Sequence, residues 1–152
     1  GRLVGSEMCI RDSLKVDPKK RILFDPSESI DFNGNTGPFI QYTYARIQSL
    51  LSKGYGNLKN DLYTDFNLKE REIIIILDQF DSVLINAYNT LNPSLIANYT
   101  YDLVKRFNSF YQSYSIIGNR PVNSFRLALS TKVGEQIKLS RSVLGIDCPE
   151  RM

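Results

Sequence analysis

The sequence predicts an all-α protein built as an antiparallel bundle of helices. From residue 37 onward, apolar side chains recur at spacings of three and four, which is the period of one face of a helix. Short stretches rich in Gly, Asn and Pro separate these runs, and short loops favour antiparallel neighbours. The length of 152 residues fits one ordinary domain, and 42% hydrophobic with 23% charged residues is typical of a soluble globular protein.

The first part of the chain does not follow this pattern. Residues 1–13, GRLVGSEMCIRDS, have neither an amphipathic period nor the apolar core of a signal peptide. They resemble translated adaptor sequence, so we exclude them from the fold; a native N-terminal arm is the alternative. Residues 14–34 contain two prolines and a brief apolar stretch at Ile22–Phe24. We expect a strand end and a turn there, with Pro26 opening a helical turn that includes Glu28, as the trailing edge of a larger unit.

The first helix is predicted to begin near Gly37 and to break at Gly54. Pro38 suits the first helical position, and Gly37 or Thr36 can cap the helix. One of its faces carries an apolar stripe of Ile40, Tyr44, Ile47 and Leu51.

Three further helices are predicted after it. The run of isoleucines at residues 73–76 has strand propensity, but the charged residues before it and the 3.6-residue period after it favour a helix over about residues 68–91. Pro93 opens the next helix with Asn92 as its cap, and Gly118–Pro121 forms the turn to the last one, which ends at Gly145. The core stripes of these helices are predicted as follows: Ile73, Ile76 or Leu77, Phe80, Leu84, Ala87 and Leu91; then Leu95, Tyr99, Leu103, Phe107, Phe110 and Tyr114; then Phe125, Leu129, Val133, Ile137 and Leu144.

Composition excludes several classes of function. The chain has no histidine, so the commonest general base and the usual zinc ligand are missing. Its two cysteines, Cys9 and Cys148, lie near opposite ends and form no metal-spaced cluster, which indicates reduced intracellular thiols. The carboxylates are scattered, and no pair is spaced to act as acid and base. No apolar run approaches the eighteen residues of a membrane span.

A second face of the first helix holds the clearest candidate site. Phe39, Tyr42 and Arg46 are spaced by three and four and lie off the apolar stripe. Aromatic rings beside an arginine suit bases and phosphates, and stacking contributes about 1–3 kcal/mol per base. The alternative, in which the rings belong to the core and Arg46 only extends outward, stays open at this point.

Other candidates are less specific. Tyr111 lies beside the core stripe of its helix, where a tyrosine can equally be a residue of the core margin. Lys105, Arg106 and Arg126 belong to a modest excess of basic residues, which is either a solvated face or an RNA-facing surface. The net charge of +3 hints only weakly at an anionic partner. The segment NGNTGP lacks the terminal Gly-Lys-Ser/Thr of a phosphate-binding P-loop.

Several stretches together resemble one known family. LFDPSESIDFNGNTGPFIQYTYARIQSLL, IANYTYDLVKRFNSFY, RLALS and the final LGIDCPERM are similar to the carboxy-terminal end of bacterial arginyl-tRNA synthetases. The resemblance is collinear from Leu14 to Met152. It implies a class I synthetase that joins arginine to its tRNA with ATP and Mg²⁺, and it implies that residues 35–152 are its helical anticodon-binding domain. Residues 14–34 would then be the last remnant of an α/β catalytic domain.

The resemblance also assigns roles to individual residues. Phe39, Tyr42, Tyr111 and Met152 match the positions that hold anticodon bases, with Arg46 on the same helix face as the first two. Lys105, Arg106 and Arg126 are candidates for contacts with the RNA backbone. Many relatives have Tyr where this chain has Phe39, so a ring can still stack there but a phenolic hydrogen bond is lost.

The same resemblance sets expectations for the whole protein. The family's ATP-binding signatures, a His-x-Gly-His motif and a Lys-Met-Ser-Lys-Ser-type loop, are absent from this chain, which contains no histidine. We therefore expect a fragment that binds arginine tRNA without catalytic residues of its own, is a monomer, and is cytoplasmic with no membrane contact. A helical protein-interaction module without any RNA role is the alternative.

Overall fold

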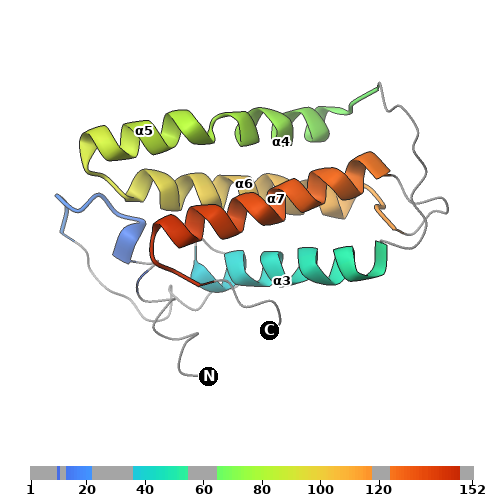
Figure 1. Ribbon diagram of the computed structural model, residues 1–152, viewed down its shortest axis with the longest axis horizontal. Coiled ribbons are helices and arrows are strands. Elements are labelled where there is room, and N and C mark those ends of the chain that lie inside the picture. Colours follow the sequence, from blue (N-terminus) through green and yellow to red (C-terminus); the bar gives the residue numbers. More distant parts are fainter. Residues whose placement is uncertain (1–9, 11–12, 22–35, 55–64, 118–123, 148–152) are drawn as a thin grey trace.

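Every regular element that the structure describes is a helix. The structure is a computed structural model and describes residues 10, 13–21, 36–54, 65–117 and 124–147 (Figure 1). Its main helices are α3 (Gly37–Gly54), α4 (Leu68–Asp78), α5 (Phe80–Thr90), α6 (Ser94–Ser113) and α7 (Ser124–Val143). No strand occurs in these ranges, so the predicted all-α class is confirmed. The strand end expected near Ile22–Phe24 lies outside the described residues.

Helix α6 is the centre of the bundle. It packs against α3, α4, α5 and α7, whereas α4 and α5 follow one another along one side and α3 lies on the other (Figure 1). The direction of the chain reverses between α3 and α4, between α5 and α6, and between α6 and α7, as short connections predict (Figure 1). A consequence is that α3 and α6 run in the same direction.

The contacts between α3 and α6 keep one register. The ring centroids of Phe39 and Tyr101 lie 5.8 Å apart, and the Arg46 side chain bonds to Asn108, so both pairs are offset by 62 positions. A constant offset is what two parallel helices in contact require. It places the second face of α3 beside the later turns of α6, where Tyr111 also lies.

The core contains most of the predicted stripes. Ile40, Tyr44, Ile47 and Leu51 of α3 are all buried, as predicted. The buried stripe members of the other helices are Ile73, Ile76, Phe80, Ala87, Tyr99, Leu103, Phe107, Phe110, Leu129, Val133 and Ile137. Gly134 lets α7 approach α3 closely, because a Cβ at this position would lie 3.0 Å from Cγ2 of Ile47. Predicted core residues Leu95, Tyr114, Phe125 and Leu144 are only half-buried.

The helical region predicted for residues 68–91 consists of two helices. Gln79 separates α4 from α5, and its backbone N–H donates to the Leu77 carbonyl and leaves the helical ladder. The hydroxyl of Ser82 donates to the Gln79 carbonyl at 2.7 Å. The same carbonyl still accepts the ladder bond from the Val83 N–H at 3.1 Å, so α5 begins directly after Gln79.

The end of α5 corrects one predicted core position. Leu91 has a left-handed backbone with φ 51°, and its N–H donates to Ala87 and Tyr88 carbonyls. This C-cap stops the helix before its last turn is complete, so Leu91 is exposed instead of buried. The Asn92 side chain supports the start of the next helix, since its Oδ1 accepts from the N–H of Ser94 at 3.1 Å and from its hydroxyl at 2.6 Å, but Pro93 and not Asn92 stands at the N-cap position. Helix α6 begins one residue later than predicted.

One buried tyrosine has an unusual environment. The Tyr99 ring packs 5.3 Å from that of Phe80, and its hydroxyl finds no hydrogen-bond partner among the described residues. Burial, and secondly the negative charge of Asp81, raise the pKa of Tyr99 to about 12. The hydroxyl is therefore neutral at physiological pH and contributes no charge to the bundle.

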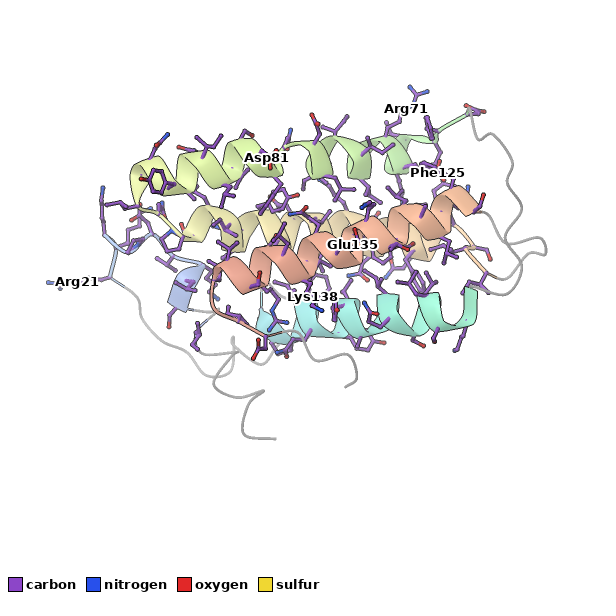
Figure 2. All side chains as sticks on the ribbon, viewed as in Figure 1. Arg21, Arg71, Asp81, Phe125, Glu135 and Lys138 are labelled. Carbon is purple, nitrogen blue, oxygen red and sulfur yellow. The ribbon has the colours of Figure 1, made fainter. Side chains whose placement is uncertain are left out.

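The outer surfaces of the helices carry most of the charged side chains. Glu135 and Lys138 are exposed on α7, as Figure 2 shows, and Lys132 pairs with Glu135 at 2.7 Å along the same helix. Exposed pairs of this kind contribute little to stability. Among the described residues, no helix is both long enough and apolar enough to cross a membrane.

Candidate nucleic-acid interface

Three of the predicted site residues meet between α3 and α6. The guanidinium carbon of Arg46 lies 4.6 Å from the centroid of the Tyr42 ring and 5.0 Å from that of Tyr111. We call these residues the Tyr42–Arg46–Tyr111 cluster. Two of them come from α3 and one from α6, so the parallel register of these helices brings them together. A cation over an aromatic face is attracted by about 0.5–2 kcal/mol, depending on its desolvation.

The three side chains of the cluster differ in exposure. Tyr42 is 47% exposed, and its ring lies against the Arg46 guanidinium. Tyr111 is half-buried and packs 6.2 Å from the Phe107 ring of the core. Since Arg46 covers part of each ring, the uncovered face of Tyr42 is the most accessible aromatic surface of the cluster. The alternative in which both rings belong to the core is therefore wrong for Tyr42, whereas Phe39 does pack against the core.

Open grooves lie on both sides of Tyr42 and Arg46. One groove, of about 740 Å³, continues past Tyr111 toward the end of α6; its lining includes Ser49, Lys53, Tyr114, Ser115, Ile116 and Ile117. The other, of about 540 Å³, lies toward the start of α3 and is lined by Phe39, Lys105, Asn108, Ser109 and Gln112. Tyr42 and Arg46 line both grooves and so form the ridge between them. Phe39 is half-buried beside Tyr101, with its ring at the edge of the second groove.

A buried hydrogen-bond network supports this ridge. Arg46 Nη1 donates to Asn108 Oδ1 at 2.8 Å, and Asn108 Nδ2 donates to Thr43 Oγ1 at 2.7 Å. The Thr43 hydroxyl donates in turn to the carbonyl of Phe39 at 2.9 Å. The network thus runs from the half-buried Arg46 side chain to the backbone of the first turn of α3.

The predicted basic residues lie in three different settings. Lys105 is exposed and lines the second groove. Arg106 is exposed on the same helix, where its guanidinium is 4.0 Å from the carboxylate of Glu72. Arg126 is partly enclosed, because its Nε donates to the fully buried carboxylate of Glu70 at 2.7 Å.

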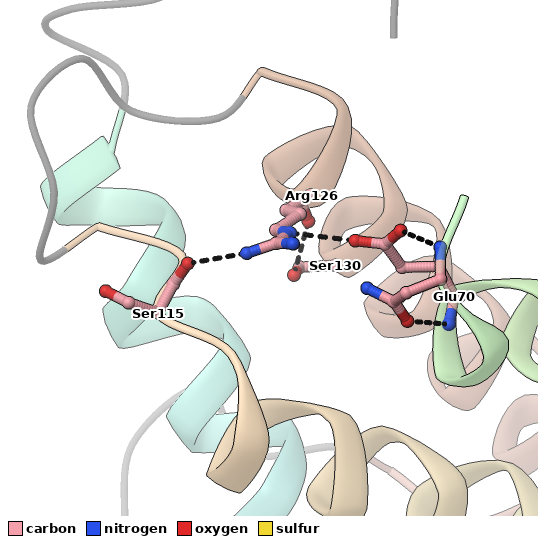
Figure 3. A network of polar contacts seen from close by, with 5 residues as sticks. Glu70, Ser115, Arg126 and Ser130 are labelled. Atoms are coloured by element: carbon pink, nitrogen blue, oxygen red, sulfur yellow. Dashed lines mark hydrogen bonds and ion pairs between the residues drawn. The ribbon is translucent and has the colours of Figure 1, made fainter. Parts of the chain in front are cut away.

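Arg126 belongs to an internal network that joins α7 to the start of α4 and to the segment after α6 (Figure 3). Glu70 Oε2 accepts from the N–H of Asn67 at 3.0 Å, while Asn67 Oδ1 accepts from the N–H of Glu70 at 2.9 Å, which forms a capping box at the start of α4. Arg126 also donates to the Ser115 carbonyl at 3.2 Å and lies 4.9 Å from the Tyr114 ring. These bonds give Arg126 a structural role, and its contact with an RNA backbone stays a prediction.

One predicted site residue cannot be placed, and the sequence analysis did not identify several residues that line the two grooves. Met152 lies outside the described residues. Ser49 and Lys53 continue the spacing of Tyr42 and Arg46 along α3, so the helical period alone could have indicated them. Asn108 and Gln112 had no such signal, because their place beside α3 follows from the packing of two helices that are distant in the sequence.

Comparison with known proteins places this geometry in a family. The family described as DALR anticodon binding domain matches residues 40–152. The arginine–tRNA ligase of Flavobacterium psychrophilum is 52% identical over 141 residues, which are 91% of this chain and 24% of that protein. The arginine–tRNA ligase of Phocaeicola vulgatus is 49% identical over 158 residues, with 99% of this chain and 26% of that protein covered.

A solved structure gives the same result for the fold. The arginyl-tRNA synthetase of Thermus thermophilus superposes with a TM-score of 0.89 at 27% identity, over 99% of this chain and 27% of that one. The chain therefore spans about a quarter of the length of the relatives it matches. These likenesses confirm the resemblance that was predicted from the sequence.

Proposed function

Because this chain belongs to the DALR anticodon-binding domain family, we propose that it binds a tRNA and that the α3–α6 face holds the unpaired nucleotides of the anticodon loop. One observation carries the proposal: the rings of Tyr42 and Tyr111, which come from two separate helices, lie within 5.0 Å of the Arg46 guanidinium. Tyr42 and Arg46 form the ridge between two open grooves.

The chemistry of this face suits single-stranded RNA. Proteins recognise RNA sequence mainly in loops, whose unstacked bases can lie on aromatic rings or on arginine. The exposed face of Tyr42 and the guanidinium of Arg46 supply such surfaces, and each stacked base is worth about 1–3 kcal/mol. Lys53 in one groove and Lys105 in the other supply cations for the phosphates that link successive bases. Phe39 and Met152 complete this set as proposed contacts.

The ligase reaction is proposed to belong to the rest of a longer protein. The arginine–tRNA ligases that this chain resembles are about four times its length. We infer that the missing part holds ATP with Mg²⁺ and carries out the joining of arginine to its tRNA, and that this chain contributes tRNA binding in the cytoplasm as a monomer. An ATP–pyrophosphate exchange assay with this chain alone should give no signal, and a signal would refute this division of labour.

The binding proposal is tested by filter binding. Transcripts of arginine tRNA, of the same tRNA with each anticodon position changed, and of an unrelated tRNA should be titrated at two salt concentrations. We expect the unchanged arginine transcript to bind most tightly. Its affinity should fall as salt rises, because Lys and Arg contacts release counterions. Equal affinity for every transcript, or none for any, would contradict the proposal.

A protein-interaction role has one observation in its favour. The outer side of α5 exposes large apolar residues, among them Ile85 and Tyr88, whose exposed fraction reaches 78%. Such residues on one helix can mark a protein contact. Recovery of a protein partner through this helix, with no RNA binding by the chain, would favour that function over the RNA-binding one.

A further inference from the structure

Arg46 is held in place by a residue that had no predicted role. The side chain of Asn108 is almost fully buried, with 8% of its surface exposed. Its carbonyl oxygen accepts from Arg46 Nη1 at 2.8 Å, and its amide donates to Thr43 Oγ1 at 2.7 Å. Because Thr43 is bonded to the Phe39 carbonyl, the amide of Asn108 can present only its oxygen to Arg46.

This contact determines where the guanidinium lies. An arginine side chain has many rotamers in water, and ordering it during binding costs about 0.5–1.5 kcal/mol. Here one hydrogen bond from α6 holds Arg46 close to the rings of Tyr42 and Tyr111, at 4.6 and 5.0 Å from their centroids. The guanidinium is therefore already at the ridge between the grooves before any ligand arrives.

The chemical type of the partner matters as much as its position. An aspartate at residue 108 could also accept from Arg46, but it has no amide to donate to Thr43, and its negative charge would offset the charge of the guanidinium and repel phosphates. A neutral amide positions the guanidinium and leaves its full positive charge available to an anionic ligand.

We propose that Asn108 is a positioning residue for RNA binding, which holds Arg46 in its binding orientation without neutralising it. The proposal rests on the proposed function and deepens it, because it adds a neutral buried support to the cluster that contacts the nucleotides. Thr43 is the second member of this support, since it fixes the orientation of the Asn108 amide.

The test measures RNA affinity and its salt dependence for two substitutions of Asn108. The probe is an RNA hairpin of the arginine-tRNA anticodon arm, which presents a loop of unpaired bases on a short stem. Asn108→Ala should weaken binding by about 2- to 12-fold, which corresponds to reordering one free arginine. The slope of log affinity against log salt should stay unchanged, because Arg46 keeps its charge. Asn108→Asp should instead make that slope shallower by about 0.7, as for one lost cation on single-stranded RNA.

Two controls separate positioning from stability. Asn98→Ala makes the same substitution near the other end of α6, where the Asn98 amide donates to the Lys15 carbonyl at 3.2 Å, and it should leave RNA affinity unchanged. In a background of Arg46→Met, Asn108→Ala should cause no further loss, because its effect acts through the missing arginine. If Asn108→Ala does not fold, Asn108→Asp decides the question through the salt slope.

Specific results would overturn the inference. Three results would each refute the inference while the wild-type chain still binds RNA. The first is wild-type affinity in the Asn108→Ala variant, and the second is an unchanged salt slope for Asn108→Asp. The third is that Asn108→Ala weakens RNA binding as much in the Arg46→Met background as in the wild type. A wild-type chain that binds no tRNA at all would refute the proposed function and this inference with it.

Discussion

The ion pair between Arg126 and Glu70 allows a quantitative prediction. Arg126→Met removes the charge but keeps a long unbranched side chain, so the main loss is the ion pair with α4. The Glu70 carboxylate has no exposed surface, and the variant leaves its charge buried without the arginine at 2.7 Å. Breaking a buried pair from one side costs about 3–5 kcal/mol.

The structure places the expected cost at the lower end of this range. Glu70 keeps the hydrogen bond from the Asn67 N–H, and the Arg126 side chain is 17% exposed, so water can approach the site it leaves. We expect the free energy of unfolding to fall by about 3 kcal/mol, which lowers the urea midpoint by about 1–3 M at ordinary m-values. Adding Glu70→Leu should restore most of the loss, apart from about 1 kcal/mol for the capping box.

The assay is urea unfolding, followed by RNA binding of the folded variant. The binding affinity of each folded molecule and its salt slope should match the wild type, because Arg126 is bonded inside the bundle. An unchanged urea midpoint together with weaker RNA binding and a shallower salt slope would refute this reasoning. It would show that Arg126 contacts the RNA backbone, as the sequence alone suggested.

Three further predictions concern other parts of the bundle. Tyr42→Ala should weaken RNA binding by about 1–3 kcal/mol in filter binding with little change in thermal midpoint. Tyr111→Ala should lower both the RNA affinity and the thermal midpoint, because its ring also packs on the core. A larger binding loss for Tyr111→Ala than for Tyr42→Ala would contradict the inference that Tyr42 is the more accessible ring. The raised pKa of Tyr99, about 12, means that the folded chain keeps a proton that the unfolded chain releases near pH 10, so this contribution to stability is complete below pH 10 and is lost as pH rises toward 12. In urea unfolding at pH 9 and pH 11, Tyr99→Phe should therefore lose less stability between the two pH values than the wild type. Equal losses would count against this assignment. Gly134→Ala should lower the urea midpoint by overpacking against the fully buried Ile47, despite a gain of about 1 kcal/mol in helix propensity, and a higher midpoint would show that α3 can move away.

The helices themselves were largely predictable because their cause is local. Apolar residues at the helical period must face a common core, so the buried stripe of α3 could be read directly from its sequence. The break at Gln79 could not, because no Gly or Pro marks it. The exposure of Leu91 was missed for a similar reason, since a left-handed C-cap at a leucine is uncommon.

The site was predictable only in part, because its halves come from distant segments. The spacing of Tyr42 and Arg46 indicated a second face on α3, and the resemblance added Tyr111. Asn108 became visible only through its bond to a residue 62 positions earlier. In the same way, Arg126 counts as a surface charge in the sequence until packing pairs it with Glu70, which lies 56 positions before it. Which residues pair across two helices depends on how those helices pack, and the local pattern of one sequence does not indicate that.

Mapping the RNA contact residue by residue is the most direct test of the central claim. Backbone amide chemical shifts of the isotope-labelled chain should be recorded while the anticodon-arm hairpin is added. The largest changes are expected at residues 39–53 of α3 and 105–117 at the end of α6, around the ridge formed by Tyr42 and Arg46. Changes concentrated on α5, around Ile85 and Tyr88, with the α3–α6 face unaffected, would contradict the account.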